Sequence, residues 1–600
     1  MNGWTGRIIR VNLTYETIET EDLNMRDAEM YLGGRGLGTK IFINEVDPQV
    51  DALSPENKLV FMAGPLTGTL AACAARFEIV SKSPLTGTIG SCSSGGFFGH
   101  IMKFAGFDGI IFEGKAKNPV YLYINNDHIE LRDASHLWGK KVSATTSELQ
   151  SETGEDSKIA CIGPAGEKLV LFASIMNDKN RAAGRSGLGA VMGSKNLKAI
   201  AVNGSRSIKV AKRQAFLDSC LDARGKLKAS GVTCTGLPIY STEILENAQS
   251  ESGAHPARNW QHSVSFNPGD VHGESAAKNS LVRNRGCFDC SIGCATVSKA
   301  PDEISANFGE VPEYEAGWSF GSDCGTNDLA SVCEANSICD ELGMDPITMG
   351  ATIACAMELF ERGYIKKADV GMDLRFGNEN AIVELTRMTG YRNGFGDKLA
   401  LGSYRMADGF GHPELSMSVK KQEIPAYDGP PMQSVNLEYA TSNSGGCHVH
   451  GFMPSPEKLG IHINANQPAS GRRAAALKAV QDLTAVVDSV GICLFTTFAI
   501  GLPEISEMLR TGTGINYTDE AVLQVGERIW NLERIFNLRC GFSKSDDTLP
   551  ERLLNESYAF SNEETKVNEM DKLLSEYYSL RGWDEDGVPA EAKKRELMIE

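Results

Sequence analysis

The 600-residue sequence contains no long apolar run. No stretch approaches the roughly 20 consecutive apolar residues that a membrane-spanning helix needs. The first residues, MNGWTGRIIRVNLTYETIE, also lack the apolar core of a secretory signal. We therefore expect a cytoplasmic protein with no membrane partner.

An excess of basic residues is also absent. The chain has 59 Lys and Arg against 77 Asp and Glu, which gives a net charge of −18. Because nucleic acids are bound through a basic surface, this balance argues against nucleic acid as the main partner. The contents of 42% hydrophobic and 23% charged residues are ordinary for a globular protein. The length predicts two to four domains with substantial cores.

The cysteines do not have the setting of a small secreted disulfide protein. Fifteen of them occur in a large chain without a secretion signal, which is typical of thiols and metal ligands. Cys287, Cys290 and Cys294 form a C-x2-C-x3-C run in RNRGCFDCSIGC. Three thiolates around one point leave a fourth ligand position open.

The sequence predicts a β-rich part followed by a mainly helical part. Residues 1–208 contain short β-type runs broken by glycine, such as RIIRVNL and DGIIFEG, and VYLYINNDHIELRD predicts a hairpin. The motif PLTGT occurs at 65–69 and 84–88, and we expect two similar turns side by side. The later sequence is mainly helical. Its clearest helix is DEAVLQVGERIWNLERIFNL, with Thr518 as its cap and an apolar stripe that we interpret as core. We place domains at 1–208, 209–417 and 418–600.

A pattern of aspartate and glycine occurs twice in the later part of the chain. DELGMD at 340–345 and DSVGIC at 488–493 each follow a helical stretch, so Gly343 and Gly491 are predicted to end helices in the left-handed conformation. Asp340 and Asp488 then lie in the last turn, where the helix dipole disfavours an acid and a donor partner is needed. A heterocycle with two adjacent N–H groups, such as a pterin or guanine, suits such a carboxylate.

The second copy of the pattern ends in Cys493, where the first copy has an aspartate. This cysteine is the predicted fourth thiolate of a 4Fe-4S cage. A structural zinc site is the alternative, although zinc usually shows two local ligand pairs.

The chain resembles the tungsten-containing aldehyde:ferredoxin oxidoreductases nearly from end to end. Segments that carry the resemblance include GRIIRVNL, LSPENKLVFMAGPLTG, NDKNRAAGRSGLGAVMGSKNLKAIAV and GERIWNLERIFNLRCGF. The resemblance implies an α+β fold, with a β-rich N-terminal domain forming the cofactor base, followed by two mainly α-helical domains. It also implies a tungsten bis-pyranopterin (tungstopterin) beside one 4Fe-4S cluster. The residues leave molybdenum open as the metal.

The same resemblance implies the residues of the site. The cluster ligands would be Cys287, Cys290, Cys294 and Cys493. The pterins would be held by Asp340, Met344, Asp345, Asp488 and Ile492. Their phosphates and a bridging Mg²⁺ would be held by Arg76, Ser93, Gly95, Arg181, Ala182, Gly184 and Arg185.

Two positions depart from the family pattern. Ser93 replaces an asparagine in the SGG turn. Some members join two subunits through a metal bound by a glutamate and a histidine. Glu334 matches that glutamate, but Val383 occupies the histidine position, so we do not predict the intersubunit metal and its existence stays open. A homo-oligomer or a hetero-complex stays open.

For the reaction, the resemblance implies oxidation of an aldehyde with water to a carboxylic acid. Electrons would leave singly through the cluster to ferredoxin or a ferredoxin-like subunit. We expect Glu315 of PEYE to act as acid and base, with His448 as hydrogen-bond or proton partner. Competing candidates are Glu310, Glu313 and His450, while Cys324 is expected to be a packed thiol. Trp318, Phe320 and Phe495 are candidates for a pocket wall or for core.

One docking surface and two other functions stay open. A positive rim for an acidic ferredoxin could be formed by Arg283, Arg285, Arg472, Arg473 and Lys478, or these residues could be solvated charges. The same cofactor could serve another low-potential reaction, such as reduction of an activated acid or aromatic acyl thioester. The chain could also be a non-catalytic iron–sulfur or zinc-bearing subunit of a complex.

Overall fold

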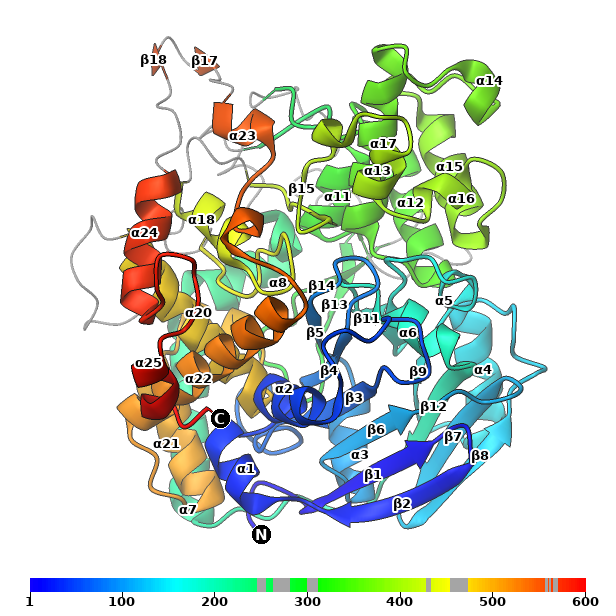
Figure 1. The fold of residues 1–600 in the computed structure, drawn as a ribbon. Coiled ribbons are helices and arrows are strands. Elements are labelled where there is room, and N and C mark those ends of the chain that lie inside the picture. The colour runs from blue at the N-terminus through cyan, green and yellow to red at the C-terminus, as the bar shows by residue number, and fades with distance from the viewer. Residues whose placement is uncertain are drawn as a thin grey trace.

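The computed structural model describes residues 1–244, 255–262, 281–298, 311–427, 433–453, 473–555, 559–560, 563–564 and 570–599. The N-terminal part contains two six-stranded sheets (Figure 1). The first has the order β2-β1-β6-β3-β4-β5, formed by β1 (Arg7–Asn12), β2 (Thr17–Asp22), β3 (Leu59–Ala63), β4 (Phe77–Lys82), β5 (Ile89–Ser94) and β6 (Gly109–Glu113). The second has the order β11-β10-β9-β12-β7-β8, formed by β7 (Val120–Asn125), β8 (His128–Asp133), β9 (Lys158–Cys161), β10 (Ile175–Asn177), β11 (Arg181–Ala183) and β12 (Leu197–Asn203).

The strands follow the apolar runs of the sequence. Every residue of β3 and β4 is buried, because both faces of the first sheet are covered. The helices of this part are α1 (Met25–Tyr31), α2 (Gly34–Glu45), α3 (Phe98–Ala105), α4 (Val142–Thr153), α5 (Pro164–Glu167) and α6 (Leu188–Ser194). The predicted hairpin is confirmed, since β7 and β8 pair antiparallel from Val120 opposite Asp133 to Asn125 opposite His128.

The expectation of two turns side by side is wrong. The two PLTGT glycines do share a left-handed conformation, with φ of 77° at Gly68 and 81° at Gly87. However, β3, β4 and β5 form an antiparallel meander. One connection therefore leaves β4 at Phe77 and the other at Lys82, at opposite ends of the strand.

Two mainly helical groups complete the fold, as expected from the sequence. The first follows α7 (Arg213–Ala229), α8 (Leu237–Tyr240), β13 (Leu281–Arg285) and β14 (Ala295–Ser298), and contains α11 (Tyr314–Phe320), α12 (Leu329–Leu342), α13 (Pro346–Glu361), α14 (Lys367–Val370), α15 (Glu379–Tyr391), α16 (Gly396–Leu399), α17 (Ser403–Asp408), β15 (Ser418–Val419) and β16 (Gln422–Glu423). The second contains α18 (Gln433–Thr441), α20 (Arg473–Val490), α21 (Leu502–Thr513), α22 (Asp519–Arg539), α23 (Glu551–Asn555), β17 (Ala559–Phe560), β18 (Glu563–Glu564), α24 (Met570–Arg581) and α25 (Glu591–Glu596). In Figure 1 the first group lies above the sheets and the second lies beside them.

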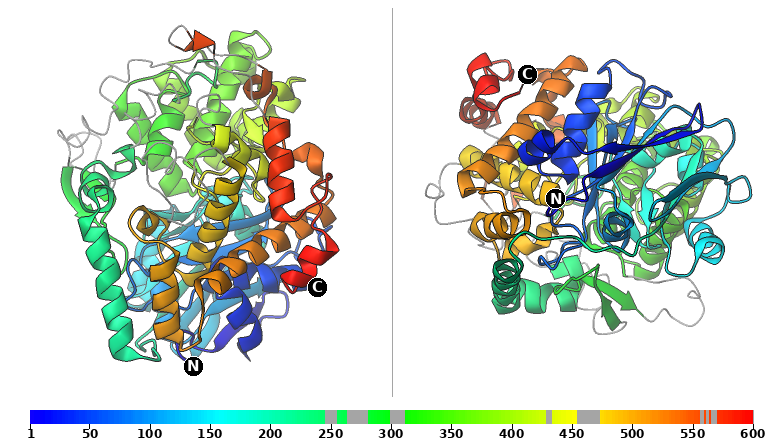
Figure 2. Two further views of the ribbon diagram at one scale, coloured as in Figure 1. Left: turned by 90° about the vertical axis from the view of Figure 1, so that its left-hand side faces the viewer. Right: turned by 90° about the horizontal axis from the view of Figure 1, so that it is seen from below.

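The second helical group is anchored to the sheets through α20 and α22, which pack on each other and on α2. The view from below in Figure 2 shows these helices on one side and the sheets on the other. The predicted cap of α22 is confirmed, because the Thr518 side chain accepts the Ala521 N–H at 3.2 Å. Its apolar stripe, Val522, Val525, Ile529, Leu532 and Phe536, is buried core. Each such side chain stabilises the fold by about 1.5–3 kcal/mol.

The helices of the described part of the chain do not include one that is both long enough and apolar enough to cross a membrane.

Candidate functional site

The three clustered cysteines lie in the connection between β13 and β14, against the N-terminal sheet domain. The Phe288 N–H donates to the Gly96 carbonyl at 3.1 Å. A Cβ atom on Gly95 would lie only 2.9 Å from the Cys287 Sγ. Glycine at position 95 therefore lets the turn after β5 approach the cysteine loop.

Cys493 reaches the same place from the end of α20. Its N–H donates to the Cys73 carbonyl at 3.2 Å, and its Sγ accepts a hydrogen bond from Arg76 Nη2 at 3.2 Å. The charges of Cys287 and Cys294 act on the same guanidinium. Cys287, Cys294 and Cys493 thus lie around Arg76, and the charge of Cys290 acts on Cys493.

The spacing of the sulfurs bears on the kind of metal. Within the described ranges, no three cysteine sulfurs lie within 4.8 Å of one another. A tetrahedral zinc ion with Zn–S bonds of about 2.3 Å requires sulfurs about 3.8 Å apart. The described cysteine sulfurs therefore do not form a preformed tetrahedral zinc site.

Cys290 has the richest set of hydrogen-bond donors in this group. Its Sγ accepts the N–H groups of Ile292 and Gly293, each at 3.4 Å, and lies 3.8 Å from the Sγ of Cys73. The Cys73 contact is the largest influence that lowers the pKa of Cys290, and the same contact raises the pKa of Cys73. The sequence pattern carried no signal for Cys73, which is far from the motif along the chain.

A cavity of about 180 Å³ lies on the other side of Arg76 from the cysteines. Predicted cofactor residues in its wall are Arg76, Ser93, Gly184, Arg185 and Asp488. Further wall residues that the sequence analysis missed are Ser91, Cys92, Ser186, Gln422, Ser444, Cys447, Val449 and Leu494. Arg76 contributes both to this wall and to the cysteine site, so the two are adjacent.

The helix ends at the two Asp-Gly motifs are confirmed. Gly343 follows α12 with φ of 75° and Gly491 follows α20 with φ of 88°, so both are left-handed. Asp340 and Asp488 lie in the last turns, where the carboxylate needs a donor. Asn180 Nδ2 lies 3.5 Å from Asp340 Oδ2.

Asp488 has a buried cationic partner. Arg35 Nη1 lies 3.4 Å from its Oδ2, while Glu533 holds the same guanidinium through two hydrogen bonds of 2.8 Å. Burial raises the pKa of Asp488 to about 6, against the opposing effect of Arg35. Neither Arg35 nor Glu533 lies near the motif in sequence, so pattern reasoning missed both.

Asp345 and Arg185 contact each other. Asp345 caps α13, because it accepts the Ile347 N–H at 3.0 Å and the Thr348 hydroxyl at 2.7 Å. Arg185 Nε donates to the same carboxylate at 3.1 Å, and its other nitrogens donate to the carbonyls of Gly446 and Glu423 at 2.6 Å. This clamp joins the sheet domain to the helical group at the cavity wall.

The remaining predicted cofactor residues do not line the cavity. Met344 and Ile492, which follow the two glycines, are 2% and 1% exposed. Arg181 and Ala182 lie on β11, with Ala182 exposed.

A second cavity, of about 180 Å³, shares Val449 and Phe495 with the first. Apolar and aromatic side chains dominate its wall: Leu237, Ile244, Tyr314, Tyr427, Phe452 and Phe498. Glu315 and His448 are the predicted catalytic residues, and both lie in this wall. The structure therefore brings them together beside the first cavity.

Glu315 has one engaged oxygen and one oxygen without a hydrogen bond. Oε2 accepts the Ala426 N–H at 3.1 Å, whereas Oε1 is buried, lacks a hydrogen-bond partner and lies 3.6 Å from His448 Nε2. That distance is too long for a hydrogen bond. Burial raises the pKa of Glu315 to about 7, and burial followed by the charge of Arg185 lowers the pKa of His448 to about 3. Desolvation outweighs mutual attraction here, so His448 is neutral near pH 7.

The competing candidates have other partners. Glu313 precedes α11 and accepts hydrogen bonds from the hydroxyls of Ser241 and Thr242. His450 Nδ1 lies 3.1 Å from the Ser444 hydroxyl, in the first cavity. Glu310 lies outside the described residues.

The cysteine and the aromatic residues considered in the sequence analysis have defined positions in the structure. Cys324 is a packed thiol, as expected, because it is fully buried against the carbonyls of Ser319 and Gly350. Trp318 and Phe320 are core residues, whereas Phe495 lines both cavities.

Part of the proposed positive rim lies far from the cysteine site. Arg473 begins α20 and Cys493 follows its far end, so 18 residues of helix separate them by about 27 Å. Lys478 is paired with Asp482 at 2.8 Å and Glu527 at 3.2 Å. Arg472 and the side chain of Arg283 lie outside the described residues, while Arg285 directly precedes the cysteine loop.

The intersubunit position is paired within the chain. Glu334 on α12 forms an ion pair of 3.2 Å with Arg387 on α15, the helix that also carries Val383. Whether two subunits share a metal here stays open.

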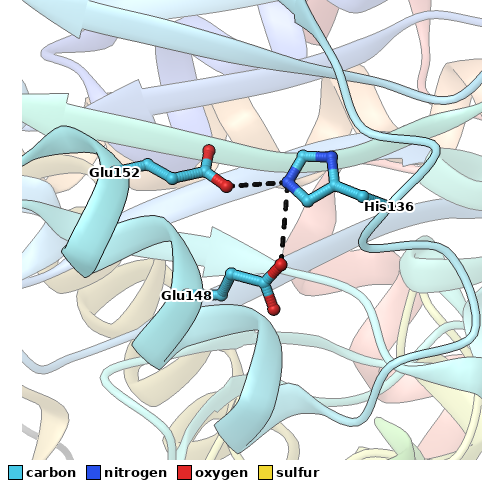
Figure 3. Close-up of side chains that lie close together, drawn as sticks. All are labelled: His136, Glu148 and Glu152. Atoms are coloured by element: carbon cyan, nitrogen blue, oxygen red, sulfur yellow. Dashed lines mark hydrogen bonds and ion pairs between the residues drawn. The ribbon is translucent and has the colours of Figure 1, made fainter.

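A separate group of possible ligand atoms lies on the surface around α4. His136, Glu148 and Glu152 have ligand atoms within 4.8 Å of one another (Figure 3). His136 Nε2 bonds Glu152 at 2.8 Å, Lys140 pairs with Glu148, and the Tyr121 hydroxyl donates to Glu152 at 3.2 Å. Because its members already satisfy one another, we interpret this group as a surface ion network.

The chain is similar to known proteins along nearly its whole length. Residues 8–204 match the model of the aldehyde ferredoxin oxidoreductase N-terminal domain, and residues 219–599 match that of domains 2 and 3. The chain belongs to the aldehyde ferredoxin oxidoreductase family. It is therefore an oxidoreductase, and the recognition made from the sequence motifs is confirmed.

Relatives in this family cover the whole chain. The tungsten-containing aldehyde ferredoxin oxidoreductase of Pyrococcus furiosus is 48% identical over 100% of this chain and 99% of the relative. The protein of the same name from Thermococcus kodakarensis is 46% identical with the same coverage. A solved structure, the active site complex BamBC of benzoyl coenzyme A reductase with 1,5-dienoyl-CoA, has a TM-score of 0.87 and 26% identity over 100% of this chain and 97% of that chain.

Proposed function

We propose that this protein oxidises aldehydes to carboxylic acids, takes the oxygen from water and delivers electrons to a ferredoxin-type acceptor. The observation that carries this proposal is the cavity with Glu315 and His448, which shares Val449 and Phe495 with the cofactor cavity. The full-length relatives, which are named as tungsten-containing aldehyde ferredoxin oxidoreductases, support it.

The proposed cofactors are a tungsten bis-pyranopterin in the first cavity, a 4Fe-4S cluster on the four cysteines and a Mg²⁺ between the pterin phosphates. When bound, the tungsten centre supplies the two-electron acceptor for the aldehyde. Asp340 and Asp488 are the proposed carboxylates for pterin N–H groups, since each ends a helix where a donor partner is favourable. Arg76, Ser93, Gly95 and Gly184 are the proposed phosphate and magnesium neighbours.

In the proposed reaction, Glu315 takes a proton at Oε1 as water or hydroxide adds to the aldehyde carbon. Its raised pKa suits this role, because a base works best with a pKa near the working pH. Neutral His448 orients the carbonyl oxygen or the carboxyl group through Nε2. The apolar walls exclude bulk water and thereby strengthen both interactions.

The proposed electron route runs from the first cavity to the four cysteines. Arg76 spans these two sites, because it lines the cavity and donates to Cys493. Arg285 is the proposed positive contact for the acceptor, since it lies beside the cysteine loop.

The same geometry also bears on substrate class. No Lys or Arg occurs among the described residues that line the second cavity, and aromatic side chains form much of its wall. We therefore propose uncharged apolar aldehydes as substrates. Reduction of an acyl thioester is the weaker candidate, because its support is a fold neighbour at 26% identity against relatives at 46–48%.

The test combines metal analysis with turnover on anaerobically purified protein. About one tungsten and about four irons per chain, with aldehyde-dependent reduction of ferredoxin, are expected. Zinc without tungsten or molybdenum would overturn the cofactor assignment. A full cofactor content with turnover of acyl thioesters and none of aldehydes would overturn the reaction.

A further inference from the structure

A fifth thiol lies against the four cysteines. Cys73 belongs to the connection between β3 and β4, far from the C-x2-C-x3-C run in sequence. Its Sγ lies 3.8 Å from the Sγ of Cys290, and the residue is 2% exposed. This separation is within hydrogen-bond range for sulfur, and water has little access to the contact.

Ligation of a cluster decides which of the two sulfurs carries the proton. A cysteine that ligates an iron–sulfur cluster is a thiolate and carries no proton. If Cys290 is such a ligand, its sulfur can only accept, and the thiol of Cys73 must donate. The N–H groups of Ile292 and Gly293 approach the same sulfur at 3.4 Å, so Cys73 is its third donor.

The backbone of Cys73 contacts a second cluster cysteine. Its carbonyl accepts the N–H of Cys493 at 3.2 Å. To make both contacts, Cys73 has a left-handed φ of 57°, which costs a residue other than glycine about 1 kcal/mol or more. Strain at a buried position is retained where the surrounding structure demands it, and here the residue contacts two of the four predicted ligands.

We infer that Cys73 is a positioning residue that raises the reduction potential of the cluster by donating its S–H to Cys290. A hydrogen bond to a ligating sulfur stabilises the more negative, reduced cluster, and such bonds are one determinant of cluster potential. This inference rests on the 4Fe-4S assignment proposed above.

The experiment is a redox titration of the anaerobically purified holoenzyme, followed by electron paramagnetic resonance. Cys73→Ala removes the donor, and Cys73→Ser keeps one. Cys73→Gly also removes the donor but relieves the left-handed strain. If the alanine variant does not load its cluster, the midpoint potential of the glycine variant is compared with wild type instead. Cys161→Ala is the matched control, because Cys161 is fully buried in β9 and contacts Thr146.

We expect a lower midpoint potential in Cys73→Ala and Cys73→Gly, recovery towards wild type in Cys73→Ser, and no change in Cys161→Ala. Iron content stays at about four per chain in each loaded variant. Equal midpoint potentials in the wild type and the donor-free variants would overturn the inference. Equal lowering in the serine and alanine variants would also overturn it, because packing rather than donation would then set the potential. A wild-type protein without a 4Fe-4S signal would instead overturn the cluster assignment.

Discussion

Replacement of Glu315 by Gln tests the catalytic assignment and has two separable consequences. Glutamine keeps the shape and the acceptor for the Ala426 N–H, but it cannot take a proton. The wild-type kcat/KM should rise with pH through about 7, because the pKa of Glu315 is about 7 and the base form is required. In Glu315→Gln we expect kcat/KM to fall by about 10²–10⁴-fold and this ascending limb to disappear.

The same substitution should stabilise the protein at alkaline pH. Burial raises the pKa of Glu315 from 4.5 to about 7, so the folded state binds the proton more tightly than the unfolded state. Folding stability is therefore lost as pH rises from about 4.5 to about 7, and the loss reaches about 3 kcal/mol above both values. Since Gln does not titrate, Glu315→Gln should unfold at a higher temperature than wild type at pH 8, with no such gain near pH 4.5.

Both effects are measured by pH–rate profiles and thermal unfolding of metal-loaded protein. Glu313→Gln is the matched control, because Glu313 lies two residues away and is held by the hydroxyls of Ser241 and Thr242. That control should keep the ascending limb. A Glu315→Gln enzyme with wild-type kcat/KM and an unchanged ascending limb would refute the assignment. Loss of the ascending limb in Glu313→Gln instead of in Glu315→Gln would also refute it.

Two further predictions concern the cavities and the cysteines. Benzaldehyde should be oxidised with a kcat/KM at least about 100-fold above that of 4-carboxybenzaldehyde, a difference of about 3 kcal/mol, because the described residues of the second cavity include no Lys or Arg to pair with the carboxylate of the latter. Similar values for the matched pair would contradict an apolar pocket. Arg76→Lys should lower the midpoint potential and the iron content of the cluster, because lysine lacks the fork that reaches Cys493 at 3.2 Å. Arg206→Lys, at an exposed pair with Asp127, serves as control, and identical cluster properties in the two variants would contradict the role of Arg76.

The local features of this protein were determined by its sequence. The left-handed ends at Gly343 and Gly491, the cap at Thr518 and the hairpin of β7 and β8 depend on neighbouring residues, and all were predicted correctly. The family and the α+β fold class also followed from the sequence, because the motifs occur in the family's order along the chain.

Only the tertiary structure decided which distant residues meet. Arg35 and Glu533 surround Asp488, and Cys73 touches Cys290, although long stretches of chain separate each pair. The antiparallel order of β3, β4 and β5 likewise sends two identical turn motifs to opposite ends of one strand. Turns and caps are stabilised within a few residues, whereas buried contacts and the pKa of Glu315 arise from surfaces that meet only when the sheets and helices pack together.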